Sequence, residues 1–395
     1  VGSYADGDII GVALNADDSE VSFYKNGSAI TNAQDASITN ENGVYFFEIQ
    51  VRKYDGDTSQ ITANFGQDST FAGAVSAGGN SDGKGVGDFK YSVPTGYLAL
   101  CSANLPEPTI SPNATTQATD HFNTILWSGN SSYPRALTGV GFQPDFVWMK
   151  ARNQAYGYGL FDSARGASSG ALTSHNTNVE PYANTNFDLD SFDADGMTWA
   201  STADTSTSNN SGDTYVAWNW KAGGNHADVS GNFIKDGVAF TPTQGTINAT
   251  SISVNTTAKF SIVTYQADSS TDADTVAHAL GTVPEFIMIK NRDNANGWAV
   301  YHAGTASDPE TDKLRLDQNY ATVDSADFWN DTAPTTNLFT VHNDAGVNYA
   351  TSGNENFDYV AYCWTSVAGY SKFGFYIGNG STDGTFVYTG FKPAF

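Results

Sequence analysis

Residues 141–150 read GFQPDFVWMK, residues 281–290 read GTVPEFIMIK, and residues 390–395 read GFKPAF. Glycine, proline and phenylalanine keep their places in all three segments. The two longer segments continue as near-continuous apolar runs, which is typical of a β-strand buried on both faces. Internal repetition of this kind determines the architecture, because each copy is one structural unit. The sequence therefore predicts tandem copies of one β-rich unit.

Other landmarks recur around this stretch in the same order. Each copy opens on an aromatic residue followed by a small polar turn, at Trp127, Tyr265 and Tyr376. Two later runs also have counterparts: YGLF at 158–161 with WAVY at 298–301, and TYVAWNW at 214–220 with DYVAYCW at 358–364. Shared order makes coincidence a poor explanation, so we expect two full copies and the start of a third, truncated copy.

The copies and the composition between them predict the domain organisation. We expect a β-sandwich module over 1–104, a proline-containing linker over 105–117, the first copy over 118–223, a linker with a small β element over 224–258, the second copy over 259–368, and the truncated third copy over 369–395. No stretch carries a helical period. The predicted fold class is all-β, with tandem β-sandwich modules.

Charge and hydropathy exclude two classes of partner. The chain has 42 Asp and Glu residues against 18 Lys and Arg residues, a formal net charge of −24. Binding to phosphate backbones needs clustered Lys and Arg, so nucleic acid is not expected as a partner. No apolar run approaches the length of a membrane span, and residues 1–8 lack the basic and apolar regions of a signal peptide. A membrane partner is therefore not expected either.

The first module has its own signature. Residues 8–27 read DIIGVALNADDSEVSFYKNG, in which Asn26-Gly27 is a strong signal for a two-residue hairpin turn. Together with ANFGQ at 63–67, this passage resembles the SPRY family, a lectin-like β-sandwich of the concanavalin A type. That family normally carries several strands ahead of this passage. The resemblance therefore implies a partial SPRY-like sandwich over 1–104.

The repeated units that follow a SPRY-like module resemble domains of large structural proteins of tailed phages, marine ones in particular. This resemblance implies a location on the virion surface. The partners that it implies are other virion proteins, further copies of the same chain, and a glycan or other receptor on the host surface.

Motifs that would indicate catalysis or zinc binding are weak. GASSG at 166–170 formally matches the nucleophile-elbow pattern but lacks the strand, sharp turn and helix that the pattern requires, so we interpret it as a loop. The histidines show no zinc-binding spacing and are expected at the surface. They are His121, His175, His226, His278, His302 and His342.

An acidic run is the candidate metal site. Carboxylates at near-alternate positions before a glycine can surround a calcium ion with oxygen ligands, although the full EF-hand pattern fails here. The candidate ligands are Asp188, Asp190, Asp193 and Asp195. The alternative interpretation is a solvated acidic loop, and no other cofactor is expected.

Aromatic residues supply the candidate glycan site. Four tryptophans lie inside strand patterns and are expected in the core: Trp148, Trp218, Trp220 and Trp364. Tyr156 and Tyr158 instead stand among polar residues and glycines, where an exposed ring can present an apolar face to a sugar. These two tyrosines are the predicted glycan-binding residues.

The predicted function is that of a non-enzymatic structural and adhesion protein of a virion, a fibre, spike or decoration protein that attaches to a host glycan. Two alternatives stay open. One is a polysaccharide depolymerase on the same kind of appendage, because a catalytic carboxylate pair can come from distant strands. The other is a secreted bacterial lectin-like adhesin.

Overall fold

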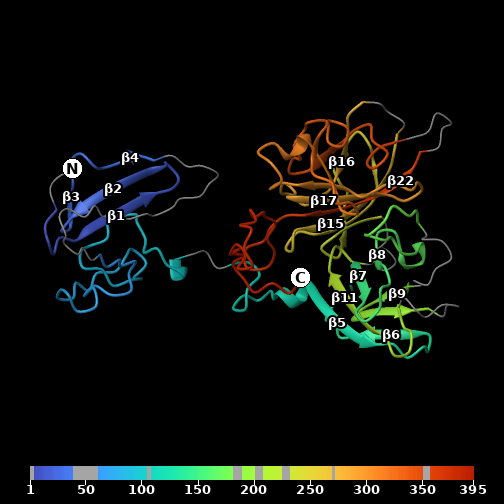
Figure 1. Ribbon diagram of the computed structural model, residues 1–395, viewed down its shortest axis with the longest axis horizontal. Coiled ribbons are helices and arrows are strands. Elements are labelled where there is room, and N and C mark those ends of the chain that lie inside the picture. Colours follow the sequence, from blue (N-terminus) through green and yellow to red (C-terminus); the bar gives the residue numbers. More distant parts are fainter. Residues whose placement is uncertain are drawn as a thin grey trace. The chain divides into compact units, whose positions relative to one another are not determined.

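The regular secondary structure of the computed structural model is almost entirely short β-strands, which irregular segments connect (Figure 1). The structure describes residues 4–38, 61–104, 108–180, 189–200, 208–224, 232–268, 272–349 and 356–395. The helices in these ranges are four 3₁₀ turns of three residues each: η1 (Ser102–Asn104), η2 (Ala118–Asp120), η3 (Ala167–Ser169) and η4 (Pro309–Thr311). None of the described helices has the length and apolar character that crossing a membrane requires. The prediction of an all-β fold is confirmed.

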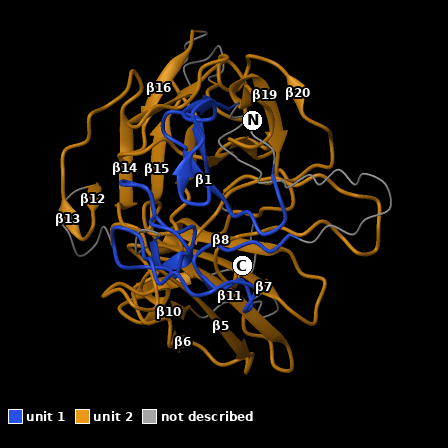
Figure 2. Ribbon diagram, turned by 90° about the vertical axis from the view of Figure 1, so that its left-hand side faces the viewer, with its two compact units in different colours: residues 1–106 blue, residues 107–395 orange. Residues whose placement is uncertain are grey.

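The chain divides into two compact units, Val1–Pro106 and Glu107–Phe395, which Figure 2 draws in different colours. We call them unit 1 and unit 2. The division falls within the segment 105–117 that the sequence analysis assigns to a linker.

Unit 1 contains a small antiparallel sheet of β1 (Ile10–Asn15), β2 (Glu20–Lys25), β3 (Ser28–Ala29) and β4 (Ala36–Ser37). Asn26 and Gly27 connect β2 to β3, with φ of 49° and 81°. Positive φ at both central residues characterises the type I′ turn, whose twist matches that of the flanking strands. The predicted hairpin at Asn26-Gly27 is confirmed.

The first copy, in unit 2, is a two-layer sandwich. Its main sheet is antiparallel and has the order β5 (Phe122–Ser128), β11 (Thr214–Trp220), β7 (Phe146–Ala151) and β8 (Tyr158–Asp162). A smaller sheet has the order β6 (Arg135–Thr138), β10 (Gly196–Trp199) and β9 (Leu189–Asp193). One apolar core joins the two sheets, with Val147 and Met149 from the main sheet against Leu137 and Met197 from the smaller one.

The second copy has a wider main sheet. Its nine strands have the order β13 (Val238–Ala239), β12 (Phe233–Lys235), β14 (Ala249–Asn255), β15 (Phe260–Gln266), β22 (Asp358–Trp364), β17 (Phe286–Asn291), β18 (Ala299–His302), β19 (Asp312–Arg315) and β20 (Val323–Asp324). The strands β16 (Asp274–Ala277) and β21 (Leu338–Val341) form a separate pair. Ile287 and Ile289 of the main sheet pack with Val276 and Phe339 of this pair in one core.

The two copies share one topology. The order β5-β11-β7-β8 in the first copy matches β15-β22-β17-β18 in the second, and the pair β6-β10 matches β16-β21. The aromatic residue that opens each copy stacks on a tyrosine of its last strand. Trp127 lies 5.2 Å from Tyr215, and Tyr265 lies 5.2 Å from Tyr359, between ring centroids. The recurring aromatic residues therefore occupy equivalent packing positions.

The recurring glycine has a backbone role. Gly141, Gly281 and Gly390 have φ of 88°, 71° and 84°. A residue with a Cβ atom adopts such angles only at a cost, so glycine is the residue that fits this turn in each copy.

The main sheets of the two copies pack face to face. We call their contact the inter-copy core: Phe146, Leu160, Leu172, Ala222, Phe260, Ile262, Met288, Trp298, Val300, Val360, Tyr362 and Trp364. Neighbouring residues of one strand serve different cores, since Phe146 belongs to the inter-copy core and Val147 to the core of its own copy. The prediction of a strand buried on both faces is confirmed for β17 from Ile287 to Asn291, whereas β7 is half-buried at Trp148 and Lys150 on one of its faces.

A buried polar network also joins the copies. The Arg165 side chain is fully buried and pairs with Asp162 at 2.5 Å and with Glu180 at 2.6 Å. Glu180 also pairs with Arg292 of the second copy, and Asp162 accepts a hydrogen bond of 2.6 Å from the hydroxyl of Tyr362. Each buried charge of this network is thus paired with a charge of opposite sign. Such pairing offsets the cost of removing a charge from water.

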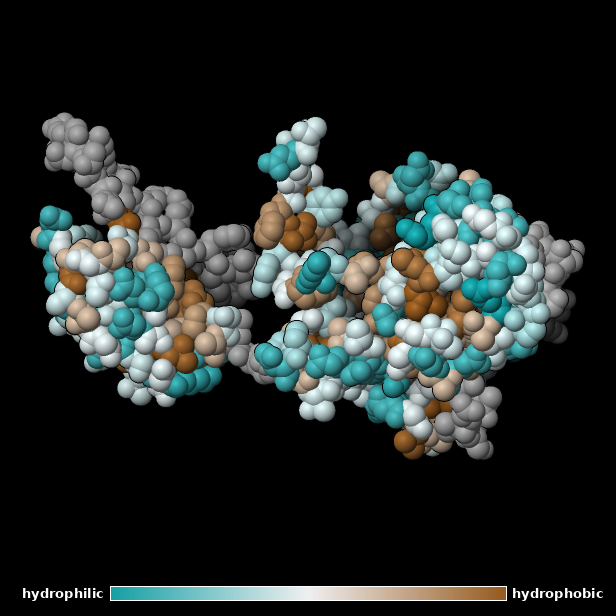
Figure 3. All heavy atoms as spheres, turned by 90° about the horizontal axis from the view of Figure 1, so that it is seen from below, coloured by the Kyte–Doolittle hydropathy of each residue, from teal (hydrophilic) through white to brown (hydrophobic). Residues whose placement is uncertain are grey.

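The remaining segments of unit 2 extend or flank the copies. The segment 224–258 contains β12, β13 and β14, and β14 pairs with β15, so this segment widens the second main sheet. Residues 369–395 form no strand. One of them, Ser371, forms an isolated β-bridge with Val367. Phe375 and Phe386 in this segment are 71% and 86% exposed. Figure 3 shows patches of hydrophobic residues on the outside of unit 2.

Candidate functional site

A pocket of about 720 Å³ lies where the main sheet of the first copy meets a loop of the second copy. This volume falls within the range of sites for small ligands, roughly 300–1,000 Å³. Its aromatic side chains are Trp148, Tyr158, Trp218, Tyr320 and Phe395. Its polar side chains are Ser174, His175, Asp317, Gln318 and Asn319. We call it the aromatic pocket.

Two neighbouring strands form one wall of the aromatic pocket. Trp148 on β7 and Trp218 on β11 are direct partners in the antiparallel register, so their side chains stand on the same face of the sheet. Tyr158 begins β8, and its ring centroid lies 6.3 Å from that of Trp148 in an edge-on arrangement. The Phe395 ring lies 5.2 Å from that of Trp218. The wall is thus a continuous group of aromatic rings.

The indole nitrogen of Trp148 is closed off from solvent. Nε1 is buried and has no hydrogen-bond partner among the described residues. A buried donor without an acceptor costs about 1–3 kcal/mol.

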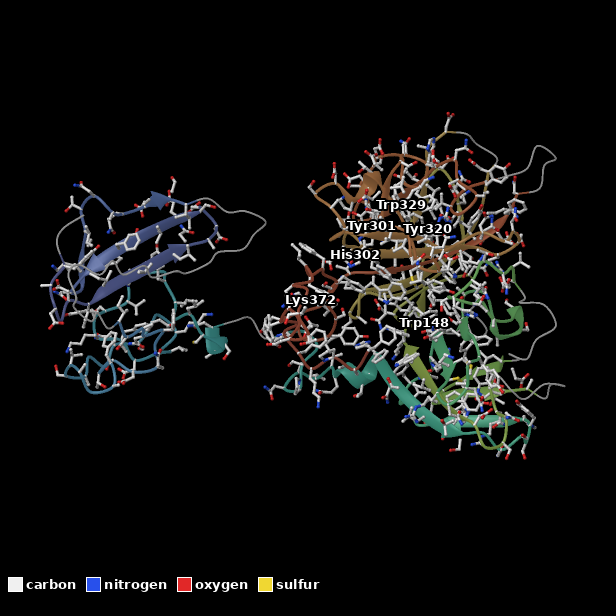
Figure 4. All side chains as sticks on the ribbon, viewed as in Figure 1. Trp148, Tyr301, His302, Tyr320, Trp329 and Lys372 are labelled. Atoms are coloured by element: carbon white, nitrogen blue, oxygen red, sulfur yellow. The ribbon has the colours of Figure 1, made fainter. Side chains whose placement is uncertain are left out.

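The loop after β19 supplies the opposite wall. It runs from Leu316 to Tyr320, and Tyr320 is 74% exposed. Asp317 Oδ1 accepts a hydrogen bond of 2.9 Å from the backbone nitrogen of Trp298, which holds the loop beside β18. Figure 4 labels Trp148 and Tyr320, which come from the first and the second copy respectively. The aromatic pocket therefore needs both copies.

His175 lies at the edge of the aromatic wall. Its Nδ1 accepts a hydrogen bond of 3.3 Å from the backbone nitrogen of Tyr158, and the two rings are 6.1 Å apart. Burial lowers the pKa of His175, and the positive charge of Lys150 lowers it further. The imidazole is therefore neutral near pH 7.

The structure separates the two predicted glycan-binding tyrosines. Tyr158 lines the aromatic pocket, whereas Tyr156 packs against the core of the first copy and is not among the lining residues. The carbonyl oxygen of Tyr156 accepts a hydrogen bond from Lys150. Glycan binding by either residue stays a prediction.

The expectation that four tryptophans lie in the core is confirmed in part. Trp364 is 7% exposed and lies in the inter-copy core, and Trp148 and Trp220 are half-buried and pack against that core. Trp218 is half-buried and is not among the residues that pack against it, so the expectation is wrong for Trp218. Strand alternation correctly identifies the face on which a side chain lies. It does not reveal whether another element covers that face, which is why Trp148 and Trp218 were missed as pocket residues.

The predicted calcium ligands have the following places. Asp188 lies outside the described residues, and Asp190 is exposed on β9. Asp193 accepts hydrogen bonds from Ser191 at 2.7 Å and Thr198 at 2.6 Å. Within the described ranges, no three His, Cys, Asp or Glu side chains come together as a metal site requires. A calcium site stays a prediction.

Asp195 has a structural role in the same hairpin. Its carboxylate accepts hydrogen bonds from the backbone nitrogens of Gly139 at 3.1 Å and Gly141 at 2.6 Å. It therefore fixes the turn that leads into the repeated stretch.

The prediction that the histidines lie at the surface is wrong for His121 and His278. They are 8% and 0% exposed. The Nε2 atom of His278 lies 3.1 Å from the carbonyl oxygen of Thr335, and burial lowers the pKa of His278 to about 4. A lone histidine in a strand-rich sequence gives no sign of such burial.

The comparisons with known proteins identify a family and no function. No curated protein and no solved structure matches the chain. Residues 117–395 match the family model described as a domain of unknown function, DUF7483. The match includes both copies and nearly all of unit 2, more than half of the chain. The chain therefore belongs to the DUF7483 family.

Proposed function

We propose that this chain is a non-enzymatic structural and adhesion protein of a virion, and that unit 2 binds a saccharide of the host surface in the aromatic pocket. The observation that carries the proposal is the grouping of Trp148, Trp218 and Tyr158 opposite the amide side chains of Gln318 and Asn319. Aromatic rings offer flat apolar surfaces for the C–H faces of a sugar, and amides exchange hydrogen bonds with its hydroxyls.

The composition of the lining favours binding over hydrolysis. Glycosidases commonly use a pair of carboxyl groups on either side of the scissile bond. Asp317 is the one carboxylate among the described residues that line the aromatic pocket. A glycosidase active site at this place would therefore lack its second acidic residue.

The virion location rests on the resemblance of the repeats and of the first module to structural proteins of tailed phages. Two properties of the chain support it. Tandem copies of one β-rich unit suit a structural protein, and a net charge of −24 keeps a crowded assembly soluble.

A glycan array probed with the whole 395-residue chain tests the saccharide-binding part. We expect binding to a subset of host glycans, with loss of at least tenfold in affinity for Tyr320→Ala and Trp218→Ala. Tyr388→Ala is the matched control, because Tyr388 is 69% exposed and lies outside the lining of the pocket, compared with 74% for Tyr320.

Absence of binding to every glycan would overturn the saccharide-binding part of the proposal. Equal loss of affinity in the Tyr388 control would show that binding does not occur in the aromatic pocket. Release of reducing ends from a bound glycan would contradict the non-enzymatic part.

A further inference from the structure

Residues 371–395, which we call the third segment, carry the opening landmarks of the repeat. In the first copy and in the third segment alike, 14 residues separate the opening aromatic residue from the glycine of the repeated stretch. This equal spacing makes Phe395 the equivalent of Phe146 and residues 371–377 the equivalent of β5. The third segment therefore corresponds to the opening part of a copy.

One face of the third segment is packed against the two full copies. Phe373 stacks on Phe286 of the second copy, with ring centroids 5.4 Å apart and ring planes inclined by 12°. The ring of Phe395 lies 5.1 Å from that of Trp220 in the first copy. Phe373 also packs against the inter-copy core, to which its equivalent in the second copy, Ile262, belongs. This face of the third segment is therefore packed much as in the second copy.

The side chains that would form the core of a third copy are instead open to solvent. In the full copies the opening aromatic residue lies in the core, where Trp127 is 8% and Tyr265 is 1% exposed. Tyr376, the equivalent residue of the third segment, is 67% exposed. Phe386 is 86% exposed, whereas its equivalent in the first copy, Leu137, is 7% exposed.

The backbone of the third segment belongs to no sheet of the described residues. Within the part of the chain that the structure describes, residues 372–395 form no backbone–backbone hydrogen bond. Lys372, labelled in Figure 4, donates a side-chain hydrogen bond of 3.1 Å to the carbonyl oxygen of Tyr388. Thr385 Oγ1 donates one of 2.7 Å to the carbonyl oxygen of Ile377. A segment with unpaired backbone groups can take up a further strand.

The two full copies show what covers the equivalent positions. In the first copy β5 pairs along its length with β11, and in the second copy β15 pairs with β22. The register places Trp127 opposite Tyr215 and Tyr265 opposite Tyr359, and the rings of each pair stack. β11 and β22 share the pattern Tyr-Val-Ala, an aromatic residue, any residue, and Trp. We call it the closing pattern.

We propose that the third segment is a docking surface for a β-strand that carries the closing pattern. The strand pairs antiparallel with residues 371–377 and stacks its tyrosine on Tyr376. In such strand addition the main-chain hydrogen bonds give affinity, and the alternate side chains give specificity. The inference goes beyond the proposed function, because Tyr376 and Phe386 are not among the residues that line the aromatic pocket.

The test measures binding of a synthetic peptide to the whole chain by calorimetry. The peptide has the sequence of residues 213–221, DTYVAWNWK, and a peptide of the same composition in scrambled order is the control. We expect the first peptide to bind and to slow amide hydrogen exchange at residues 372–377. Tyr376→Ala should weaken its binding by about tenfold or more, because an aromatic anchor is lost.

Tyr320→Ala is the matched control variant, because Tyr320 is 74% exposed and lines the aromatic pocket. It should keep the affinity for the peptide and lose the affinity for the saccharide, whereas Tyr376→Ala should do the reverse. The two variants thus distinguish failure of this inference from failure of the proposed function. Denaturation curves check that both variants are folded.

Three results would overturn the inference. The first is that the peptide does not bind, and the second is that the scrambled peptide binds equally well. The third is dimerisation of the whole chain, measured by sedimentation, that Tyr376→Ala abolishes. A second copy of the chain would then be the occupant of the third segment.

Discussion

Three equivalent positions of the repeat have different burial in the first and second copies. In the first copy these positions hold Trp148, Tyr158 and Trp218, and in the second they hold Met288, Trp298 and Tyr362. The residues of the second copy are at most 1% exposed and lie in the inter-copy core. Those of the first copy are half-buried and line the aromatic pocket. One sheet face can therefore be a core or a site, depending on what covers it.

A loop of the first copy covers this face of the second main sheet. The carbonyl oxygen of Thr173 accepts a hydrogen bond of 2.8 Å from Trp298 Nε1, and that of Thr177 accepts one of 3.4 Å from Lys290 Nζ. The loop after β8 thus lies over the second main sheet. No such loop lies over Trp218 in the described part of the chain, where residues 316–320 and Phe395 leave a pocket instead.

The largest effect is expected from breaking the buried network that joins the copies. Arg165→Met leaves the carboxylates of Asp162 and Glu180 without their shared cation. Removal of one partner from a buried ion pair costs about 3–5 kcal/mol. We expect the free energy of unfolding of unit 2 to fall by about that amount in urea denaturation of the whole chain.

Arg135→Met is the control for this change, because Arg135 is only half-buried on β6 and forms no salt bridge among the described residues. A loss below about 1 kcal/mol is expected there, as is usual at exposed sites. Similar losses for the two arginines would contradict a role of the network in holding the copies together.

Exchange of equivalent residues gives the next largest effect. Met288→Trp inserts a larger side chain into the filled inter-copy core, and overpacking costs about 1–3 kcal/mol. Trp148→Met instead removes part of the pocket wall, so it should weaken saccharide binding more than it destabilises the fold. Denaturation and binding measured on both variants check the comparison. A larger stability loss for Trp148→Met than for Met288→Trp would contradict it.

The smallest effect is a change in the free energy of unfolding with each unit of pH, and it comes from Asp145 in the first copy. Asp145 is fully buried and accepts hydrogen bonds from Ser163 at 2.7 Å and from the backbone nitrogens of Ala222 at 2.6 Å and Gly224 at 3.2 Å. Burial raises the pKa of Asp145 from 3.8 to about 6. Its counterpart in the second copy, Glu285, accepts hydrogen bonds from Ser366 instead.

The raised pKa has a definite sign for stability. Between about pH 4 and pH 6 the folded protein holds a proton on Asp145 that the unfolded chain has lost, so stability falls as the pH rises through this window. Asp145→Asn is neutral throughout. Relative to this variant, the unmodified chain should lose about 1.4 kcal/mol for each pH unit in that window. Parallel stability curves for the two proteins would show that the Asp145 pKa is not raised.

Other groups titrate in the same pH window, so the effect of Asp145 is the difference between the stability of the unmodified chain and that of Asp145→Asn at each pH. Burial lowers the pKa of His278 to about 4, so His278 stabilises the folded state at neutral pH and that contribution is lost as the pH falls from about 6.5 toward 4. This effect has the opposite sign from that of Asp145. The contribution of His278 cancels when Asp145→Asn is compared with the unmodified chain at the same pH.

The local sequence determined the strands, the turns and the repeat. Alternation and apolar runs fix which residues form β7 and β17, glycine at positions of positive φ fixes the turn before each strand, and Asn26-Gly27 fixes its hairpin. These features depend on backbone sterics and on neighbours close in the chain, so a single sequence carries them. Tyr158 could be found as a candidate because it directly follows a polar segment that contains a glycine.

Only the tertiary structure decided which faces of the repeated sheet are closed. Met288 and Trp148 follow the same pattern in sequence, yet one is buried and the other lines the aromatic pocket. The difference comes from the packing of one copy on the other and from the loop 316–320, contacts between residues far apart in the chain. Such contacts depend on how the sheet faces meet in space. The alternation of residues along a strand does not reveal which other element packs on it.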